Sequence, residues 1–371
     1  MQPKVDMDFV MDHLVKLLTT PSPSGHTDEV MAMVEEAFAA IGGGATGGSA
    51  RGGASDGAAG GARGGALEIR RTNKGGLIAT LRGADDENQR LLSAHVDTLG
   101  GMVKEIKASG RLKYVPIGGA SPHSVEGEYC TILADDGRRY TGTILTIKAA
   151  AHVYGQEARD LPRKEENMEI RLDEKVKTAA ETRALGIEVG NFIAFDPRTE
   201  VTPAGFIKSR HLDDKASVAV LFGVAKALVE AVVRPAATTH FFITNFEEVG
   251  HGASYGVPPK TKEYIAVDMG VVGDGIQADE YCVSICAKDS TGPYDEGLRR
   301  RLVELAKANG IPHAVDIYPY YGSDASAALR AGADIRAIVI GQGVDASHAY
   351  ERTHREGIKA TADLLVAYLL S

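Results

Sequence analysis

Three apolar stretches that each end in ionisable residues decide how this chain folds: Leu91–Asp97 (LLSAHVD), His240–Glu248 (HFFITNFEE) and Tyr264–Asp268 (YIAVD). Short apolar runs set among helical patterns are typical of buried strands in an α/β sheet. In such sheets, ligands bind just beyond the carboxyl ends of the strands. The pattern therefore places the ionisable ends of all three runs in one crevice.

Outward from these strands, helical and strand patterns alternate. Helices are expected over 7–19, 27–40, 216–232, 296–309, 324–331 and from about 355 onward, and strands over 77–81, 90–95, 240–246, 264–267, 281–287, 314–318 and 335–340. The segment 102–196 differs, because its apolar pieces are short, separated by glycine turns and without crossover helices. It predicts a small all-β domain inserted into an α/β catalytic domain made of residues 1–101 and 197–371.

The composition of the chain excludes several classes of protein. The chain has 371 residues, of which 44% are apolar and 25% charged, so it can bury a sizeable core and is not disordered throughout. A formal charge of −9 argues against a nucleic-acid partner. No apolar run approaches the roughly 20 residues of a membrane helix. Three cysteines without zinc-finger spacing cannot form a disulfide framework, so we expect a cytoplasmic protein.

The stretch 42–66 consists almost entirely of Gly, Ala, Ser and Arg. It has nothing to bury, so we expect a mobile loop. The alternative is a nucleic-acid-binding Gly/Arg tract. That alternative is disfavoured because the stretch has no aromatic residue and only two arginines, Arg51 and Arg63.

Two further segments add ionisable residues, SRHLDDKAS (209–217) and DASHAYE (345–351). The candidates in all five segments are His95, Asp97, Asp213, Asp214, Glu247, Glu248, Asp268 and His348. Any one acid at a strand end is more often a turn or cap residue. Together they favour a site for two metal ions with nitrogen and oxygen ligands. The mixture of imidazole and carboxylate favours zinc, or cobalt or manganese, over calcium or magnesium.

The order of the motifs HVD, LDDK, EEVG, AVDMG and SHAYE resembles the tetrahedral aminopeptidase (glutamyl aminopeptidase) family of cocatalytic-metal peptidases. Accessory segments match too, among them PSPSG near the start, IGG, KDSTGPYDEGL and GSDASAAL. The later segments are similar to a bacterial subgroup that occurs with osmoprotectant synthesis. The resemblance implies a zinc-peptidase-like three-layer α/β domain with a mixed sheet, interrupted by a small β-barrel domain. It also implies a homo-oligomer, at least a dimer and up to a hollow dodecamer.

The same resemblance implies a role for each motif residue. His95 and Asp268 are expected to hold one metal ion, Glu248 and His348 the second, and Asp213 to bridge the two. Asp97 is expected to orient the imidazole of His95. Glu247 remains free and is expected to act as the general base. The bond between Asp213 and Asp214 is expected to be a cis peptide.

Weaker candidates surround these motifs. The residues expected to touch substrate are His251, Ser323 and Asp324, with His211, Tyr318, Tyr320 and Tyr321 as further possibilities that loop or packing contacts would explain equally well. His354 is a competing metal ligand, although its ERTH context indicates a helix start. Cys282 and Cys286 alternate with apolar residues and are expected to pack. Thr98 stands where the family often has Glu, which leaves the ligands intact.

These patterns predict a metallo-aminopeptidase that removes N-terminal residues from small peptides. Two divalent ions per subunit would activate a water molecule, and Glu247 would take its proton and pass it to the leaving amine. The alternative enzyme is a metal-dependent amidohydrolase that deacylates N-acylated amino acids or dipeptides. A non-enzymatic scaffold is disfavoured by the full ligand set. A glycosidase would use two carboxylates without metal, so a chelator would separate it from the metalloenzymes.

Overall fold

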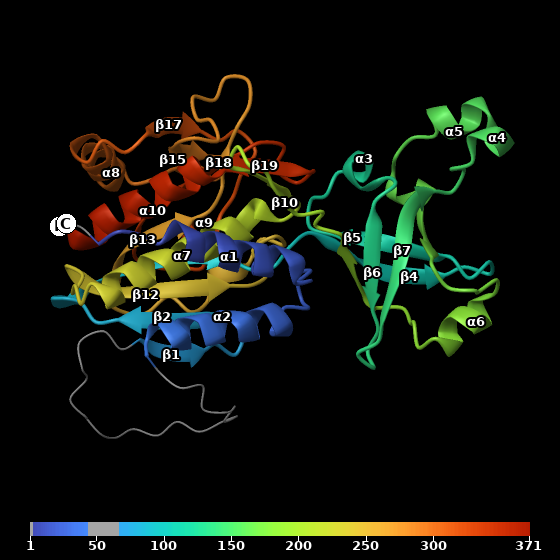
Figure 1. The fold of residues 1–371 in the computed structure, drawn as a ribbon, viewed down its shortest axis with the longest axis horizontal. Helices are drawn as coiled ribbons and strands as arrows, with labels where there is room; N and C mark the ends of the chain where they lie inside the picture. Colours follow the sequence, from blue (N-terminus) through green and yellow to red (C-terminus); the bar gives the residue numbers. More distant parts are fainter. Residues whose placement is uncertain (1–2, 44–66) are drawn as a thin grey trace.

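A ten-stranded mixed sheet forms the centre of the α/β domain in the computed structural model, which describes residues 3–43 and 67–371 (Figure 1). Its strands, in spatial order, are β1 (Glu68–Arg71), β2 (Leu77–Leu81), β12 (Ala237–Thr244), β3 (Asp85–His95), β13 (Thr261–Val267), β18 (Arg336–Val344), β15 (Val283–Asp289) and β16 (Gly292–Pro293), with β14 (Gly270–Val271) beside β18 and β17 (His313–Ile317) beside β15. The four central strands β12, β3, β13 and β18 are parallel. Their carboxyl ends therefore lie at one edge of the sheet.

Helices cover both faces of this sheet, which gives the expected three layers. The helices of the domain are α1 (Met7–Thr19), α2 (Asp28–Ile41), α7 (Leu212–Glu230), α8 (Glu296–Ala308), α9 (Asp324–Arg330) and α10 (Arg355–Leu370), with a 3₁₀ turn η2 (Gly252–Ser254). One sheet face packs against α1, α2, α7, α8 and α10 in a single large core. The other face packs against α9 and η2 through a smaller cluster around Phe242 and Tyr264. The mixed-sheet α/β fold predicted from the sequence is confirmed.

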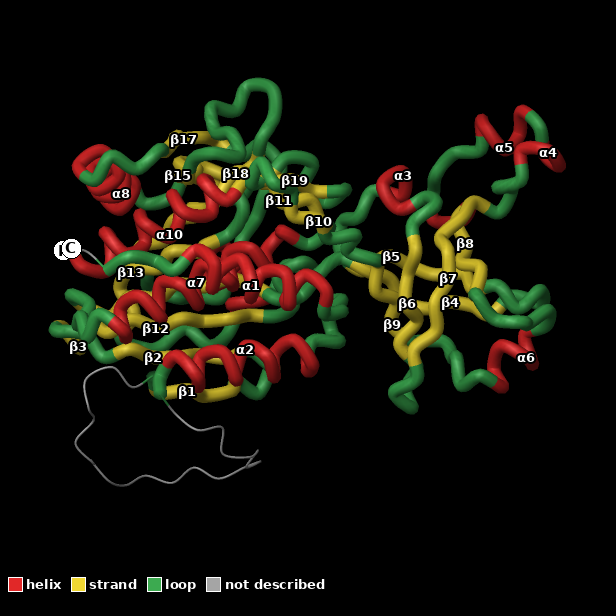
Figure 2. Tube along the Cα trace, in the orientation of Figure 1, coloured by secondary structure: helices red, strands yellow, loops and turns green. Residues whose placement is uncertain are grey.

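The inserted segment closes into a six-stranded antiparallel barrel, on the right in Figures 1 and 2. Its strands, in order around the barrel, are β4 (Gly100–Ile106), β5 (Leu112–Ile117), β8 (Met168–Leu172), β7 (Arg139–Thr146), β6 (Tyr129–Leu133) and β9 (Phe192–Phe195). Short helical turns decorate it: α3 (Pro122–Val125), α4 (Ala151–Tyr154), α5 (Gln156–Asp160), η1 (Glu165–Asn167) and α6 (Ala179–Ala184). The barrel has its own core, which includes Ile132, Ile144 and Ile170. The inserted segment is therefore a small all-β unit with its own hydrophobic core, as the sequence predicted.

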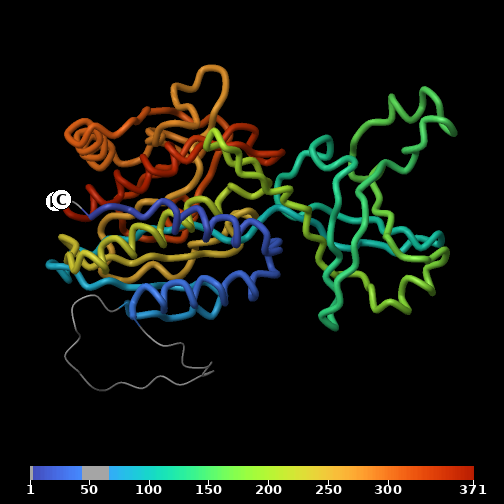
Figure 3. The backbone as a smooth tube through the Cα atoms, viewed as in Figure 1, coloured from blue at the N-terminus to red at the C-terminus, as the bar shows by residue number. Residues whose placement is uncertain are grey.

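A small sheet lies between the two parts: β10 (Glu200–Val201), β11 (Phe206–Ser209) and β19 (Glu351–His354). The chain enters the barrel five residues after β3 ends at His95, and it returns through β10 and β11 just before α7 begins at Leu212. The continuous trace in Figure 3 shows this path out and back. The barrel is thus inserted at the edge of the sheet where the candidate site residues lie.

Several boundaries differ from the sequence expectations, and two of them lie beside the candidate site. The strand expected over 240–246 ends at Thr244, because the chain turns at Phe246, which has a left-handed φ of 64°. The helix expected from 216 begins at Leu212, with Asp213 and Asp214 in non-helical conformations in its first turn. The stretch 44–66, which contains nearly all of the segment expected to be a mobile loop, lies outside the described residues. No helix in the described part of the chain is both long and apolar enough to cross a membrane.

Candidate metal centre

The site is assembled at the carboxyl ends of three adjacent parallel strands. His95 is the last residue of β3, and Asp268 follows directly after β13. Glu247 and Glu248 lie in the turn that follows β12. Asp213 is added from the first turn of α7, where its bond to Asp214 is cis, as expected. The strand-end argument thus accounts for how segments far apart in sequence meet in one place.

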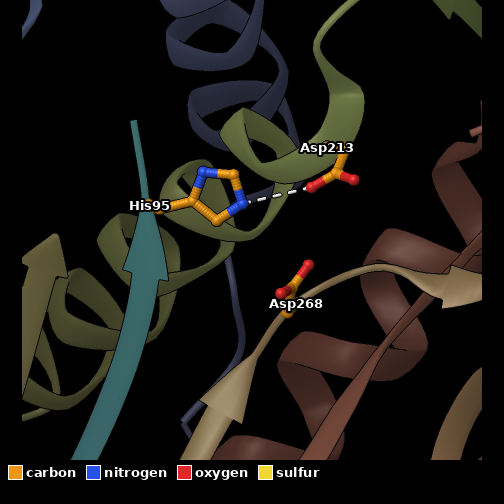
Figure 4. Close-up of side chains that lie close together, drawn as sticks. All are labelled: His95, Asp213 and Asp268. Carbon is orange, nitrogen blue, oxygen red and sulfur yellow. Dashed lines mark hydrogen bonds and ion pairs between the residues drawn. The ribbon is translucent and has the colours of Figure 1, made fainter. Parts of the chain in front are cut away.

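His95, Asp213 and Asp268 form the first cluster (Figure 4). Each offers one ligand atom, and these atoms all lie within 4.8 Å of one another. The His95 Nε2 atom lies 3.1 Å from Oδ1 of Asp213. Figure 4 shows the three side chains converging from a strand end, a helix start and the loop after a second strand. All three residues are buried.

Asp213, Glu248 and His348 form the second cluster, again with ligand atoms within 4.8 Å of one another. The His348 Nε2 atom lies 3.4 Å from Oδ2 of Asp213 and 3.5 Å from Oε2 of Glu248. Asp213 therefore belongs to both clusters and presents a different carboxylate oxygen to each histidine. Two sites that share one carboxylate are an arrangement suited to a pair of cations.

Glu247 lies beside the clusters without belonging to either among the described groups. Its Oε2 atom is 3.7 Å from Nε2 of His95. The backbone N–H groups of Glu247 and Glu248 donate to the carboxylate of Asp97, at 3.1 and 3.3 Å. Gly250, with a φ of 84°, completes the turn. Because the strand has already ended, both adjacent glutamates face the site.

Asp97 is fully buried and anchors more than one element. Its Oδ1 atom is 3.5 Å from Nδ1 of His95, while that nitrogen is closer, at 3.0 Å, to the backbone carbonyl oxygen of Asp97. Ser24, from the PSPSG turn, donates its hydroxyl to Oδ2 at 2.5 Å. Asp97 thus fixes the His95 ring mainly through its main chain, and its carboxylate holds the turn that carries Glu247.

Burial and like charge raise the pKa of most acids in the site. Burial, and then the nearby Asp213, raise the pKa of Asp268 to about 7 and hold the pKa of Glu248 well above its usual value. Burial and the neighbouring acids do the same to the pKa of Glu247. Asp213 differs, because hydrogen bonds with His348 and His95 outweigh burial and lower its pKa. Acids crowded in this way are relieved of their mutual repulsion by bound cations.

Glu351 is a residue of this site that the sequence argument missed. Its buried carboxylate accepts the backbone N–H of Asp213 at 3.0 Å and that of His348 at 3.1 Å. It therefore orients one residue shared by both clusters and one residue of the second cluster. The signal was present in the SHAYE motif, where Glu351 follows His348 by three residues, but its partner across the fold is not visible in the sequence.

A cavity of about 240 Å³ opens onto the clusters. Beside the acids and His348, its lining includes Tyr320, Tyr321, Ser323 and Arg330. Arg330 was not singled out from the sequence, because a lone arginine at the end of a helix carries no pattern. Of the residues expected to touch substrate, Ser323 lines this cavity, and so do Tyr320 and Tyr321, which the sequence offered as further possibilities.

Asp324 and His251 do not belong to the described lining of this cavity. Asp324 is buried and accepts the hydroxyl of Thr244 and, at 2.7 Å, the N–H of Ala253, so it ties β12 to the loop after it. His251 is exposed and stacks on Phe246, with ring centroids 5.1 Å apart.

The other residues considered as substrate contacts or metal ligands lie outside the described cavity lining and outside both clusters. Tyr318 is buried and donates to Ser284 at 2.7 Å. His211 is the N-cap of α7, and burial lowers its pKa well below the usual value. His354 caps α10 and contacts the carbonyl of Ala204 at 2.8 Å, outside both clusters. Cys130, Cys282 and Cys286 are free and buried.

Two solved structures share this combination of domains. An aminopeptidase from the archaeon Desulfurococcus kamchatkensis superposes with a TM-score of 0.81 at 20% identity, covering 98% of this chain and 95% of that one. The TET1 peptidase of Pyrococcus horikoshii superposes with a TM-score of 0.80 at 19% identity, covering 98% and 99%. At these identities the likeness shows the fold, a mixed α/β sheet with a small inserted barrel.

Sequence similarity then gives the family. Residues 75–364 match the family model described as M42 glutamyl aminopeptidase. The chain is also 50% identical over 361 residues, 97% of either chain, to a Bacillus subtilis (strain 168) protein named "Putative aminopeptidase YhfE". The chain therefore belongs to the M42 aminopeptidase family, whose members are metal-dependent hydrolases of peptide bonds.

Proposed function

We propose that this chain is a two-metal aminopeptidase that removes the N-terminal residue of small peptides. The observation that carries the proposal is the position of Asp213, which presents one carboxylate oxygen to His95 and the other to His348. His95 and Asp268 would hold one cation, Glu248 and His348 the other, and Asp213 both. A single shared carboxylate offsets the repulsion between two neighbouring dications.

The donor set fits such ions. Each cluster combines one imidazole with two carboxylates, which suits zinc, with cobalt or manganese as alternatives. Divalent ions bound there would supply Lewis acidity and a water of lowered pKa. Neither cluster uses the cysteines, which are buried elsewhere.

Glu247 is the residue we assign as general base. It lies next to both clusters, and a carboxylate in that place can take the proton from the attacking water and deliver it to the leaving amine. Burial and the neighbouring acids raise the pKa of Glu247 above its ordinary value, which favours uptake of a proton by this carboxylate. Asp97 holds the backbone of Glu247 and thereby positions it.

Chelation is the test of this function. Removal of metal with a chelator should abolish cleavage of peptides with a free N-terminus, and zinc, cobalt or manganese should restore it. N-acetylated versions of the same peptides should not be cleaved. Cleavage that survives chelation would overturn the metal-dependent mechanism, and faster cleavage of the acylated peptides would point to a deacylase.

We also propose that the protein works as a homo-oligomer. The Pyrococcus horikoshii relative is described as assembling into a tetrahedron or a large octahedral shell. In this chain the barrel exposes apolar side chains, including Tyr129, Val153 and Val189. The buried free cysteines agree with a reducing compartment such as the cytoplasm.

A further inference from the structure

The inserted barrel reaches the second cluster through a pair of glycines, Gly118 and Gly119, which directly follow β5 and close the IGG segment. A Cβ on Gly119 would lie 3.1 Å from Nδ1 and 3.5 Å from Cε1 of His348. A Cβ on Gly118 would lie 3.4 Å from the carbonyl oxygen of Glu248. The backbone of the barrel therefore lies against both residues that the second cluster does not share with the first.

The contact with Gly119 falls on the ring nitrogen of His348 that points away from the cluster. Nε2 of His348 faces Asp213 and Glu248, whereas Nδ1 faces the barrel. The backbone of Gly119 is also a hydrogen-bond partner of this ring. A metal-binding histidine commonly donates its other ring N–H to a carbonyl or carboxylate oxygen, which fixes the orientation of the ring and its tautomer. Gly119 is placed to give this support, and the lack of a side chain permits the close approach.

His348 needs outside support more than His95 does. The side chain of His348 is 41% exposed, whereas that of His95 is 2% exposed. The backbone of His348 has a left-handed φ of 63°, a conformation that residues other than glycine seldom adopt unless surrounding contacts hold them there. Burial in the α/β domain therefore fixes the histidine of the first cluster but does not by itself fix that of the second.

A second contact joins the barrel to the loop that carries His348. Arg210 is buried, lies just before α7 and donates to the carbonyl of Ser124 in the barrel, five residues after Gly119. The same guanidinium donates at 3.0 Å to the carbonyl of Ala349, the neighbour of His348. The planar guanidinium presents its donors in a fixed geometry, so it holds the barrel segment and the histidine loop at a set separation.

We propose that Gly118, Gly119 and Arg210 are positioning residues of the second cation site, so that the affinity of this site depends on the inserted barrel. This inference rests on the proposed two-metal function. The three residues would bind no cation themselves and would act through Glu248 and His348. Disturbing them should therefore weaken the second cation while the first cluster keeps its own.

Metal titration of the full chain, freed of metal, tests the inference. Calorimetry with zinc gives the number of ions bound per chain and a Kd for each. The variants are Gly119→Ala, which places a methyl group against the His348 ring, and Arg210→Ala, with Arg210→Lys as the conservative replacement. His348→Ala supplies the titration of a protein that lacks the second histidine. Urea unfolding of each metal-free protein separates a loss of metal affinity from a loss of stability.

Gly137→Ala is the matched control. Gly137 lies in the turn between β6 and β7, and among the described residues no atom lies within 4 Å of a Cβ added there. Its φ of 83° means that the added methyl group strains the barrel backbone. The control therefore disturbs the barrel without touching the second cluster.

The wild-type protein should bind two ions. Gly119→Ala and Arg210→Ala should bind one ion as the wild type does and the other about 10–100-fold more weakly, so that their titrations approach that of His348→Ala. Arg210→Lys should be intermediate, and Gly137→Ala should bind both ions normally even if it is less stable. If Arg210→Ala does not fold, Gly119→Ala decides the outcome.

Three results would overturn the inference and leave the proposed function intact. They are normal binding of both ions by Gly119→Ala, equal weakening of both ions in that variant, and loss of the second ion in Gly137→Ala. Binding of fewer than two ions by the wild-type protein would overturn the two-metal function itself.

Discussion

At the scale of single residues, the site depends on adjacent acids that take different roles. Glu247 and Glu248 are neighbours in sequence, yet only Glu248 shares a cluster with Asp213 and His348. In an extended strand their side chains would point to opposite faces. The turn after Thr244 removes that restriction and brings both carboxylates to the site.

Substitution separates the two roles. Glu247→Gln should keep its bound metal and its affinity for substrate, but lose kcat by about 10²–10⁴-fold, because an amide cannot accept the proton. Glu248→Gln should instead lose metal from the second cluster. Metal analysis of both purified variants, alongside steady-state kinetics, checks the assignment. Loss of metal in Glu247→Gln, with activity regained on adding metal, would mean that the roles are reversed.

Glu351 should matter although we expect it to bind no metal. In Glu351→Ala, the buried N–H group of Asp213 and the half-buried N–H group of His348 lose their acceptor, which costs about 1–3 kcal/mol of stability. Metal affinity should fall as well, because both residues lose their orientation. Glu351→Gln keeps one acceptor oxygen and should be intermediate. Chemical denaturation and metal titration measure the two effects, and a Glu351→Ala protein unchanged in both would remove this role.

The sequence argument named the residues that form the two clusters, but it did not name the residues that position them. His95 and Asp268 were recognisable because an ionisable residue ends a buried strand, which is a local pattern. Glu351 and Arg330 were not, because their significance arises only from what tertiary folding brings beside them. Asp324 was expected to touch substrate, but folding places it under the loop where it accepts two hydrogen bonds.

At the scale of elements, β12 joins a buried polar network to the turn that carries Glu247 and Glu248. His240 lies midway along this strand, within hydrogen-bonding distance of the Thr80 hydroxyl at 2.9 Å and of Gln89 Oε1 at 2.8 Å. Apolar periodicity identified the strand correctly, but it ended the strand two residues late. The left-handed conformation of Phe246 ends the strand, and such a conformation at a non-glycine residue leaves no local sequence signal.

His240 makes stability depend on pH. Burial lowers its pKa to about 4, below the ordinary value of 6.5, so the folded protein keeps this ring neutral while the unfolded chain takes up a proton first. Its contribution is fully present above pH 6.5 and is lost as the pH falls from 6.5 to 4, by up to about 1.4 kcal/mol per pH unit.

The variant His240→Gln should flatten this part of the pH profile. Urea unfolding at pH 7 and pH 5 gives the comparison, and the difference between variant and wild type removes the contribution of all other titrating groups. If the variant lost as much stability between the two pH values as the wild-type protein, His240 would not be the source.

At the scale of the whole molecule, the barrel is part of the site as well as an insertion. A side chain at Gly119, in the loop after β5, would place its Cβ 3.1 Å from Nδ1 of His348. Arg210, which is buried, donates to the carbonyl of Ser124 in the barrel and, at 3.0 Å, to that of Ala349 beside His348. The sequence predicted the inserted domain from its short strands. It could not predict these contacts, which join residues far apart in the chain.

The outer end of the barrel should carry the contacts between subunits. In Figure 1, α4 lies on the side of the barrel away from the α/β domain, and its Val153 is 72% exposed. An apolar side chain so exposed gains free energy when a neighbouring subunit covers it. Light scattering should therefore give the mass of a dimer or a larger assembly, and not the 39.2 kDa of a single chain.

Val153→Asp should shift this mass toward the monomer, because the carboxylate would have to be desolvated in the contact. Val232→Asp is the control, since Val232 is 73% exposed but follows α7 in the α/β domain. The two substitutions add the same charge at equal exposure, so their difference reports location alone. If Val232→Asp dissociated the assembly and Val153→Asp did not, the subunits would meet through the α/β domain, and the barrel would serve the site without building the oligomer.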